Sequence, residues 1–166
     1  MDQLKKHTLS ALVQNQPGVL AQVAGMFAAR DFNIDSLAVG RTEEYDLSRI
    51  TIVVIGNDDI MEQVRKQLGK LIPVVKIYDW TGQNLVQRDL MLIKVTCLPE
   101  KRPEIQSLID MFQAKVVDIG PKFVLAEVTG PEEKIEAFID MCRPYGIKDV
   151  ARTGVIAMPR HTRSIR

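Results

Sequence analysis

The sequence predicts an α+β fold made of two tandem βαββαβ domains of the ferredoxin-like kind. Two observations lead to this prediction. Alternating strand patterns and three-to-four-residue helix patterns follow the same order twice along the 166 residues. Between the two runs, Gly82-Gln83-Asn84 interrupts the pattern without a long linker rich in Pro, Gly or Ser. We therefore expect one domain over 1–82 and a second over 83–166.

The first half contains each element of this pattern in order. Alternation over Thr8–Gln14 predicts a strand, and the turn at 15–18 leads into an amphipathic helix that ends near residue 30. Two β-rich runs, 33–39 and 49–55, lie on either side of a polar loop at 41–46. Asn57 then begins a second helix, because a short polar side chain can satisfy free amides of a first turn. The apolar stripe of that helix consists of Ile60, Val64, Leu68 and Leu71. Residues 74–78 form the closing strand.

The second half repeats the order. A strand is predicted over Leu90–Cys97, and the helix that follows opens at Pro103 and Glu104. Two strands, 116–119 and 123–129, are joined across Gly120-Pro121. Pro131 and the carboxylates after it favour another helix start. The remaining residues, 147–157, contain one last strand that we expect to be interrupted at Thr153-Gly154.

Composition narrows the classes of function. The 22 Lys and Arg residues nearly balance 21 Asp and Glu residues, so the chain lacks the positive excess typical of proteins that bind a phosphate backbone. No helix-turn-helix segment is visible either, so a sensor that regulates transcription is the least favoured alternative. We predict no nucleic-acid partner.

The chain carries no pattern for export or membrane insertion. Its N-terminus is polar and lacks the apolar stretch of a signal peptide, and its longest apolar runs are strand-sized. Cys97 and Cys142 lie within apolar strand and helix patterns, which is typical of buried thiols. We expect a cytoplasmic protein without a membrane partner.

Signatures of catalysis are missing. The two histidines, His7 and His161, lie near the ends of the chain without an obvious partner. The common nucleophile, metal, phosphate and dinucleotide motifs are absent, and paired carboxylates fall at loops or helix starts. We predict no catalytic residue, no metal site and no cofactor on this chain. The alternative is a small stand-alone enzyme on a ferredoxin-like sheet, which activity of the purified chain without a partner would support.

The turn Asn15-Gln16-Pro17-Gly18 is the candidate binding site. It precedes a helix, so the amides of Gly18, Val19 and Leu20 would point outward and attract a carboxylate. Gly18 permits close approach, and the amides of Asn15 and Asn33 can bind an ammonium or a carboxylate. The same residues also favour a strand-to-helix turn for conformational reasons alone. The spacing therefore leaves a structural and a binding role equally open.

At this turn the chain resembles a known family. The segments 15–20, 33–37 and 47–51 (NQPGVL, NIDSL and LSRIT), with Ala151-Arg152-Thr153-Gly154 near the end, are similar to the small regulatory subunit of acetohydroxyacid synthase, also called acetolactate synthase. The likeness covers nearly the whole chain and is strongest over 8–78. It implies that 1–82 is an ACT regulatory domain and 83–166 a ferredoxin-like domain.

The resemblance also implies a function. Such subunits activate a separate catalytic subunit, which carries thiamine diphosphate, Mg²⁺ and usually FAD, and they confer feedback inhibition by valine in branched-chain amino acid synthesis. The effector site would use Asn15, Gly18, Val19, Leu20 and Asn33 at the interface of an ACT homodimer. Valine, leucine and isoleucine remain alternatives, because one methylene is worth only ~1–3 kcal/mol. Both the loop 41–46 and the second domain remain candidates for the surface that contacts the catalytic subunit.

One position departs from the family pattern. Relatives often have Ser directly before the glycine of the turn, whereas this chain has Pro17. Proline has no amide hydrogen to donate, so one contact to a carboxylate is expected to differ.

Overall fold

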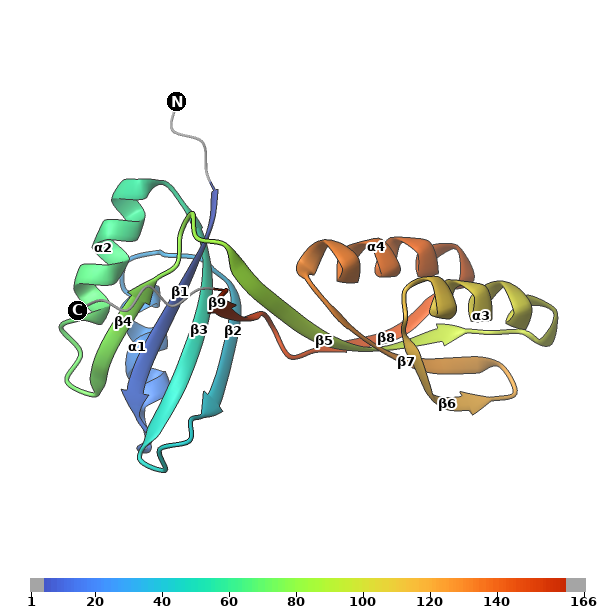
Figure 1. Cartoon of the computed structure of the whole chain (residues 1–166), viewed down its shortest axis with the longest axis horizontal. Coiled ribbons are helices and arrows are strands. Elements are labelled where there is room, and N and C mark those ends of the chain that lie inside the picture. The colour runs from blue at the N-terminus through green and yellow to red at the C-terminus, as the bar shows by residue number, and fades with distance from the viewer. Residues whose placement is uncertain (1–4, 161–166) are drawn as a thin grey trace. The chain divides into compact units, whose positions relative to one another are not determined.

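The computed structural model describes residues 5–160 and divides into two compact units, each considered by itself (Figure 1). The first unit ends at Val86 and resumes at Ile156, and the second is Gln87–Val155. The expected division of the chain into 1–82 and 83–166 thus differs from this one, because the last strand groups with the first unit. The closing basic segment, including His161, lies outside the described residues.

The first unit has the βαββαβ order that the sequence predicts. Its four-stranded antiparallel sheet has the order β2-β3-β1-β4, so β1 and β3 are central and β2 is an edge. The elements are β1 (Lys5–Gln14), α1 (Val19–Ala28), β2 (Ile34–Arg41), β3 (Leu47–Gly56), α2 (Asp58–Leu68) and β4 (Val74–Asp79).

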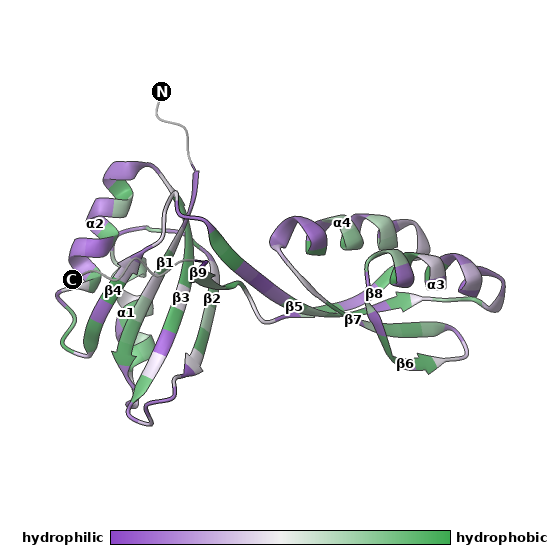
Figure 2. Cartoon of the chain, in the orientation of Figure 1, coloured by the Kyte–Doolittle hydropathy of each residue, from purple (hydrophilic) through white to green (hydrophobic). Residues whose placement is uncertain are grey.

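Alternation along the central strands builds the core of this unit. Leu9, Ala11 and Val13 point to one face of β1, where they pack with Val23 and Phe27 of α1. Figure 2 shows hydrophobic positions concentrated along β1 and β3 and hydrophilic ones along much of α2. Burying a side chain of this size contributes about 1.5–3 kcal/mol, so this face holds the helices on the sheet.

The second unit repeats the fold, as expected. Its strands pair in the order β6-β7-β5-β8, and β9 pairs with β5. Strand β5 begins at Leu85, earlier than the predicted start at Leu90. The elements are β5 (Leu85–Thr96), α3 (Arg102–Met111), β6 (Lys115–Gly120), β7 (Phe123–Gly130), α4 (Glu132–Cys142) and β8 (Ile147–Arg152), with short 3-10 turns at Pro99–Lys101 and Arg143–Tyr145. Strand β9 (Ile156–Pro159) pairs with β5 but belongs to the first unit.

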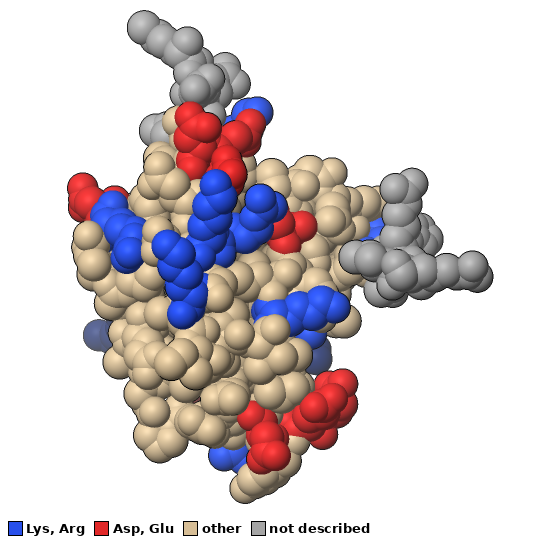
Figure 3. Space-filling model, turned by 90° about the vertical axis from the view of Figure 1, so that its left-hand side faces the viewer, with Lys and Arg blue, Asp and Glu red and all other residues tan. Residues whose placement is uncertain are grey.

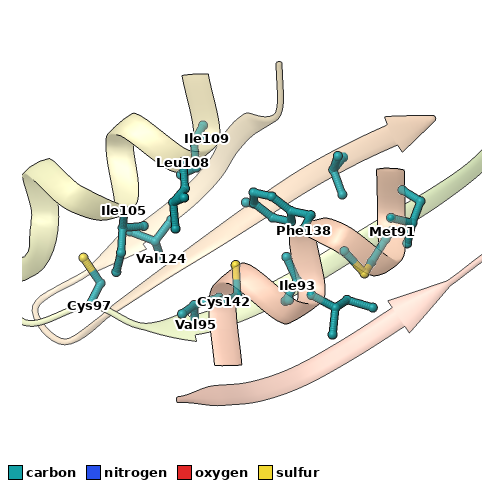
Figure 4. Close-up of a cluster of buried hydrophobic side chains, with 14 residues drawn as sticks. Met91, Ile93, Val95, Cys97, Ile105, Leu108, Ile109, Val124, Phe138 and Cys142 are labelled. Atoms are coloured by element: carbon teal, nitrogen blue, oxygen red, sulfur yellow. The ribbon is translucent and has the colours of Figure 1, made fainter. Parts of the chain in front are cut away.

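The core of the second unit lies between its sheet and its two helices. Figure 4 shows Ile105 and Leu108 of α3, Phe138 of α4 and Ile93 of β5 within one cluster of buried side chains. Phe138 also contacts Phe112 edge to face, with ring centroids 5.1 Å apart. Cys142 is buried in the same cluster and is a free thiol, like Cys97.

The helices of both units are short. None of those found in residues 5–160 combines the length and the apolar character needed to cross a lipid bilayer.

Asn57 caps α2 as expected, since its side chain accepts a hydrogen bond from the amide of Ile60 at 2.9 Å.

Candidate functional site

The turn between β1 and α1 adopts a conformation that glycine favours. Gly18 is the residue before α1 and has φ +84° and ψ −9°. L-residues with a side chain rarely adopt this left-handed conformation. Apart from Gly18 and its two chain neighbours, no heavy atom of the described residues lies within 4 Å of the place where a Cβ would stand, so the space above the helix start is open. Glycine is needed here for its backbone angle, and it leaves the turn accessible.

Most of the amides at this helix start have no acceptor within the part of the chain that the structure describes. Within the described residues, the amides of Gly18, Leu20 and Ala21 donate to no main-chain or side-chain oxygen, while that of Val19 donates to the carbonyl of Gln16 at 3.4 Å. Helix α1 has no side-chain cap and no acidic residue in its first turn. Because unpaired amides and the helix dipole both favour an anion, a carboxylate fits this position.

Asn15 is tied to the loop between β2 and β3. Its main-chain amide donates to the carbonyl of Asp46 at 2.7 Å, and its side-chain amide donates to the carbonyl of Tyr45 at 3.4 Å. The second bond is long, and Asn15 is exposed, so its side chain is available to a ligand that offers a better partner. Asn15 therefore links the candidate site to this loop. Sequence reasoning missed this link because it depends on backbone groups.

Asn33 lies far from the turn within one chain. It directly precedes Ile34, which is opposite Val54, whereas Asn15 follows the far end of β1, where Gln14 is opposite Leu47. These two levels of the sheet are about seven strand residues apart, or roughly 23 Å. The structure thus brings together Asn15, Gly18, Val19 and Leu20 but not Asn33. Val19 is buried, whereas Leu20 is exposed beside the turn.

The segment 47–51 places an arginine on the face of the sheet opposite the helices. Arg49 Nη1 donates to the hydroxyl of Ser10 at 2.8 Å, and its guanidinium lies 5.4 Å from the centre of the Tyr78 ring. Ser10 is fully buried. Alternation along β3 could have identified this outward arginine, but its neighbours come from β1 and β4.

The segment 151–154 forms a buried ion pair. Asp89 is 1% exposed and accepts from Arg152 Nη2 at 2.6 Å and from Nε at 2.8 Å, while Arg152 Nη1 also binds Glu136 at 2.6 Å. Burial lowers the pKa of the Arg152 guanidinium, but its hydrogen bonds to Glu136 and Asp89 outweigh that effect and leave the pKa above its usual value. Thr153 donates to Asp89 at 3.3 Å. This motif joins β5, α4 and β8 and has a structural role.

His7 has two partners, contrary to the expectation from sequence. Its ring is buried, with Nε2 3.0 Å from the carbonyl of Gly56 and Nδ1 3.2 Å from the hydroxyl of Thr81. Within residues 5–160, no group of three or more His, Cys, Asp or Glu side chains is placed to hold a metal ion.

Comparisons with known proteins agree with this architecture. Residues 9–76 match the model of the AHAS small subunit-like ACT domain, and residues 88–161 match the model of the small subunit of acetolactate synthase. The fold and the open helix start in the first unit therefore define a two-domain regulatory protein of the ACT class.

Individual relatives identify the family. The chain is 55% identical to a probable acetolactate synthase small subunit of Archaeoglobus fulgidus, with 93% of this chain and 97% of the relative covered. It is 48% identical to the acetolactate synthase small subunit of Mycolicibacterium smegmatis, with coverages of 96% and 94%. The crystal structure of the small subunit from Thermotoga maritima matches with a TM-score of 0.88 at 41% identity, covering 95% and 98% of the two chains. The chain belongs to the acetolactate synthase small subunit family, whose name implies a catalytic partner subunit.

Proposed function

We propose that this chain activates the catalytic subunit of acetolactate synthase and makes it sensitive to feedback inhibition by valine. The observation that carries this proposal is the start of α1, where free amides and Gly18 leave an open position for a carboxylate. Valine would place its carboxylate there and its ammonium near the carbonyl side of Asn15. Thiamine diphosphate, Mg²⁺ and FAD belong to the catalytic subunit in this proposal, and this chain binds none of them.

The position of Asn33 supports a homodimer. Strand β2 is an edge of its sheet, so two copies can pair β2 with β2 in antiparallel fashion about a twofold axis. Such pairing places the start of β2 in one copy opposite its end in the other. Asn33 then approaches the Asn15 turn of the partner copy rather than that of its own chain. The effector site would consist of Asn15 and Gly18 from one copy and Asn33 from the other.

Asn15 also provides a way to report occupancy. A ligand that takes its side-chain amide removes the 3.4 Å bond to the Tyr45 carbonyl, and this changes the restraint on the loop after β2. Coupling between effector and catalytic subunit is then reciprocal, typically worth about 1–3 kcal/mol. The catalytic subunit should therefore change valine affinity by the same factor as valine changes affinity for the catalytic subunit.

Calorimetry with valine, together with acetolactate formation by the catalytic subunit, tests the site. Gly18→Asp places a carboxylate where the ligand's carboxylate would lie, and Gly18→Asn is the matched control, with nearly the same shape and no charge. Both residues tolerate the left-handed conformation better than other side chains. We expect the Asp variant to lose valine binding by a much larger factor than the Asn variant. Equal binding by both variants would contradict the site.

Mixing two variants tests the shared site. Asn15→Ala and Asn33→Ala should each abolish valine binding as homodimers. In a mixed dimer, one site combines the intact Asn15 of one copy with the intact Asn33 of the other. Random exchange of subunits should restore about a quarter of the sites, because half of the dimers are mixed and each has one intact site. No recovery on mixing would contradict the dimer arrangement.

The purified chain should form no acetolactate without the catalytic subunit, and activity of the chain alone would instead support the stand-alone enzyme.

We place the complex in the cytoplasm. Cys97 and Cys142 are buried free thiols, as is usual in a reducing compartment.

A further inference from the structure

We propose that the outer face of the first unit's sheet, around Arg49, Lys76 and Tyr78, is the docking surface for an acidic segment of the catalytic subunit. We call these three residues the cationic platform. The inference rests on the proposed function, because it assigns the contact surface of that same partner. It adds a third candidate to the loop 41–46 and the second unit.

Three neighbouring strands bring the platform together. Leu12 of β1 is opposite Arg49 of β3 on one side and opposite Lys76 of β4 on the other. In the next row, Ser10 is opposite Tyr78. Directly paired residues point to the same face, and this face is opposite the one that carries Leu9, Ala11 and Val13. The two cations are therefore about 10 Å apart at their Cα atoms, with an apolar side chain between them.

The platform is held in a fixed geometry before any partner binds. Arg49 is anchored by its 2.8 Å bond to Ser10, whose side chain is 0% exposed. The Tyr78 ring has the Arg49 guanidinium 5.4 Å away and the Lys76 ammonium 4.9 Å away. It also packs against the ring of buried Trp80, with centroids 6.1 Å apart. Ordering these side chains on binding costs little, because they are already restrained.

Among the described residues, no carboxylate pairs with either cation of the platform. Neither Arg49 nor Lys76 takes part in an ion pair anywhere in residues 5–160. Figure 3 shows several basic side chains on the side of the first unit that carries α2. Those of the helix itself differ from the platform, since Lys66 binds Glu62 at 2.6 Å and Arg65 lies 4.0 Å from Asp79.

This combination selects an acidic protein segment. Two like charges beside one ring repel each other, and a carboxylate between them would relieve that repulsion. A guanidinium binds a carboxylate with two parallel hydrogen bonds, and Tyr and Arg are among the residues that most often carry the binding energy of interfaces. Leu12 and the Tyr78 ring supply apolar contact between the charges. An extended segment with one or two Asp or Glu residues fits this surface.

The test measures activation and affinity with the purified catalytic subunit. Arg49→Gln and Lys76→Glu are the test variants, and Lys70→Gln is the control, because it removes one charge from an exposed residue just after α2. Lys76 is exposed, so its variant should fold normally. We expect both platform variants to bind the catalytic subunit about 10- to 100-fold more weakly, with the wild-type affinity falling as salt rises. The control should bind like the wild type.

Valine binding and oligomeric state separate the possible outcomes. Unchanged valine affinity and an unchanged dimer, combined with weaker binding of the catalytic subunit, would support the platform. Normal activation of the catalytic subunit by Lys76→Glu and Arg49→Gln would overturn the platform. The proposed function is decided separately, by whether the wild-type chain activates the catalytic subunit. Loss of the dimer in either variant would also overturn the platform, because the face would then be an interface between copies of this chain.

Discussion

Replacing Arg152 should destabilise the second unit more than replacing either of its carboxylate partners. Among the contacts that the structure describes, Arg152→Gln leaves the Asp89 carboxylate, which is 1% exposed, with the hydroxyl of Thr153 at 3.3 Å. Removing one partner of a buried pair in this way costs about 3–5 kcal/mol. A loss of this size approaches the whole stability of a unit of this length.

The other two members of the cluster should matter less. Asp89→Asn leaves Arg152 with Glu136 at 2.6 Å and with solvent, because the Arg152 side chain is 30% exposed, so we expect a loss of about 1–3 kcal/mol. Glu136 is 49% exposed, and solvent screens its charge. Glu136→Gln should therefore cost less than about 1 kcal/mol.

Urea unfolding followed by far-UV circular dichroism measures this order. Trp80 is the single tryptophan and lies in the first unit, so its fluorescence reports that unit separately. Arg143→Gln is the control, because its ion pair with Asp140 is about two-thirds exposed on both sides. With a urea dependence of about 1 kcal/mol per molar for a small unit, Arg152→Gln should lower the midpoint of the circular dichroism transition by about 3–5 M. If Arg143→Gln and Arg152→Gln shift this midpoint equally, the reasoning about buried charge is wrong.

Two further predictions concern the caps and thiols. Asn57→Ala should lower the unfolding free energy by about 1 kcal/mol, since it removes the acceptor for the Ile60 amide, and Asn57→Asp should restore it; thermal melts of the three chains check this. Burial raises the pKa of the Cys142 thiol from its usual value of 9.0 to about 11, so the folded state keeps the proton longer than the unfolded state. Stability should therefore fall as pH rises from 9 toward 11, and Cys142→Ala should flatten that slope in a pH series of urea titrations. Native Cys142 should also react with a thiol reagent at pH 8 much more slowly than the urea-unfolded chain.

Local pattern was enough to predict most of the fold. The strand at 8–14 and the helix start at Asn57 depend on neighbours in sequence, and both appear where expected. Strand ends were harder to place. Lys5 and Lys6 extend β1 because Gly56 and Ile55 lie opposite them, and no periodicity in the residues themselves indicates that pairing. The expected interruption at Thr153-Gly154 is real, since β8 ends at Arg152 and β9 begins at Ile156.

The candidate site could be predicted only in part. Gly18 and Asn15 are adjacent in sequence, so the turn that contains them could be proposed from spacing. Asn15 and Asn33 lie at opposite ends of the sheet because of the order and direction of its strands. The spacing of motifs along the sequence does not indicate this distance. Arg49 and Lys76 are 27 positions apart in sequence and are brought together by their shared neighbours Leu12 and Tyr78. Contacts of this kind have no signal in a single sequence.

The return of β9 to the first unit affects how the protein forms on the ribosome. The second unit is complete at Val155, whereas the first still awaits the strand that begins at Ile156. Domains generally fold as units while the chain is being synthesised. The half that emerges second can therefore finish folding first, its ends closed by the contact of Asp89 with Arg152. The first unit would therefore reach its final form only after translation has passed the whole of the second unit.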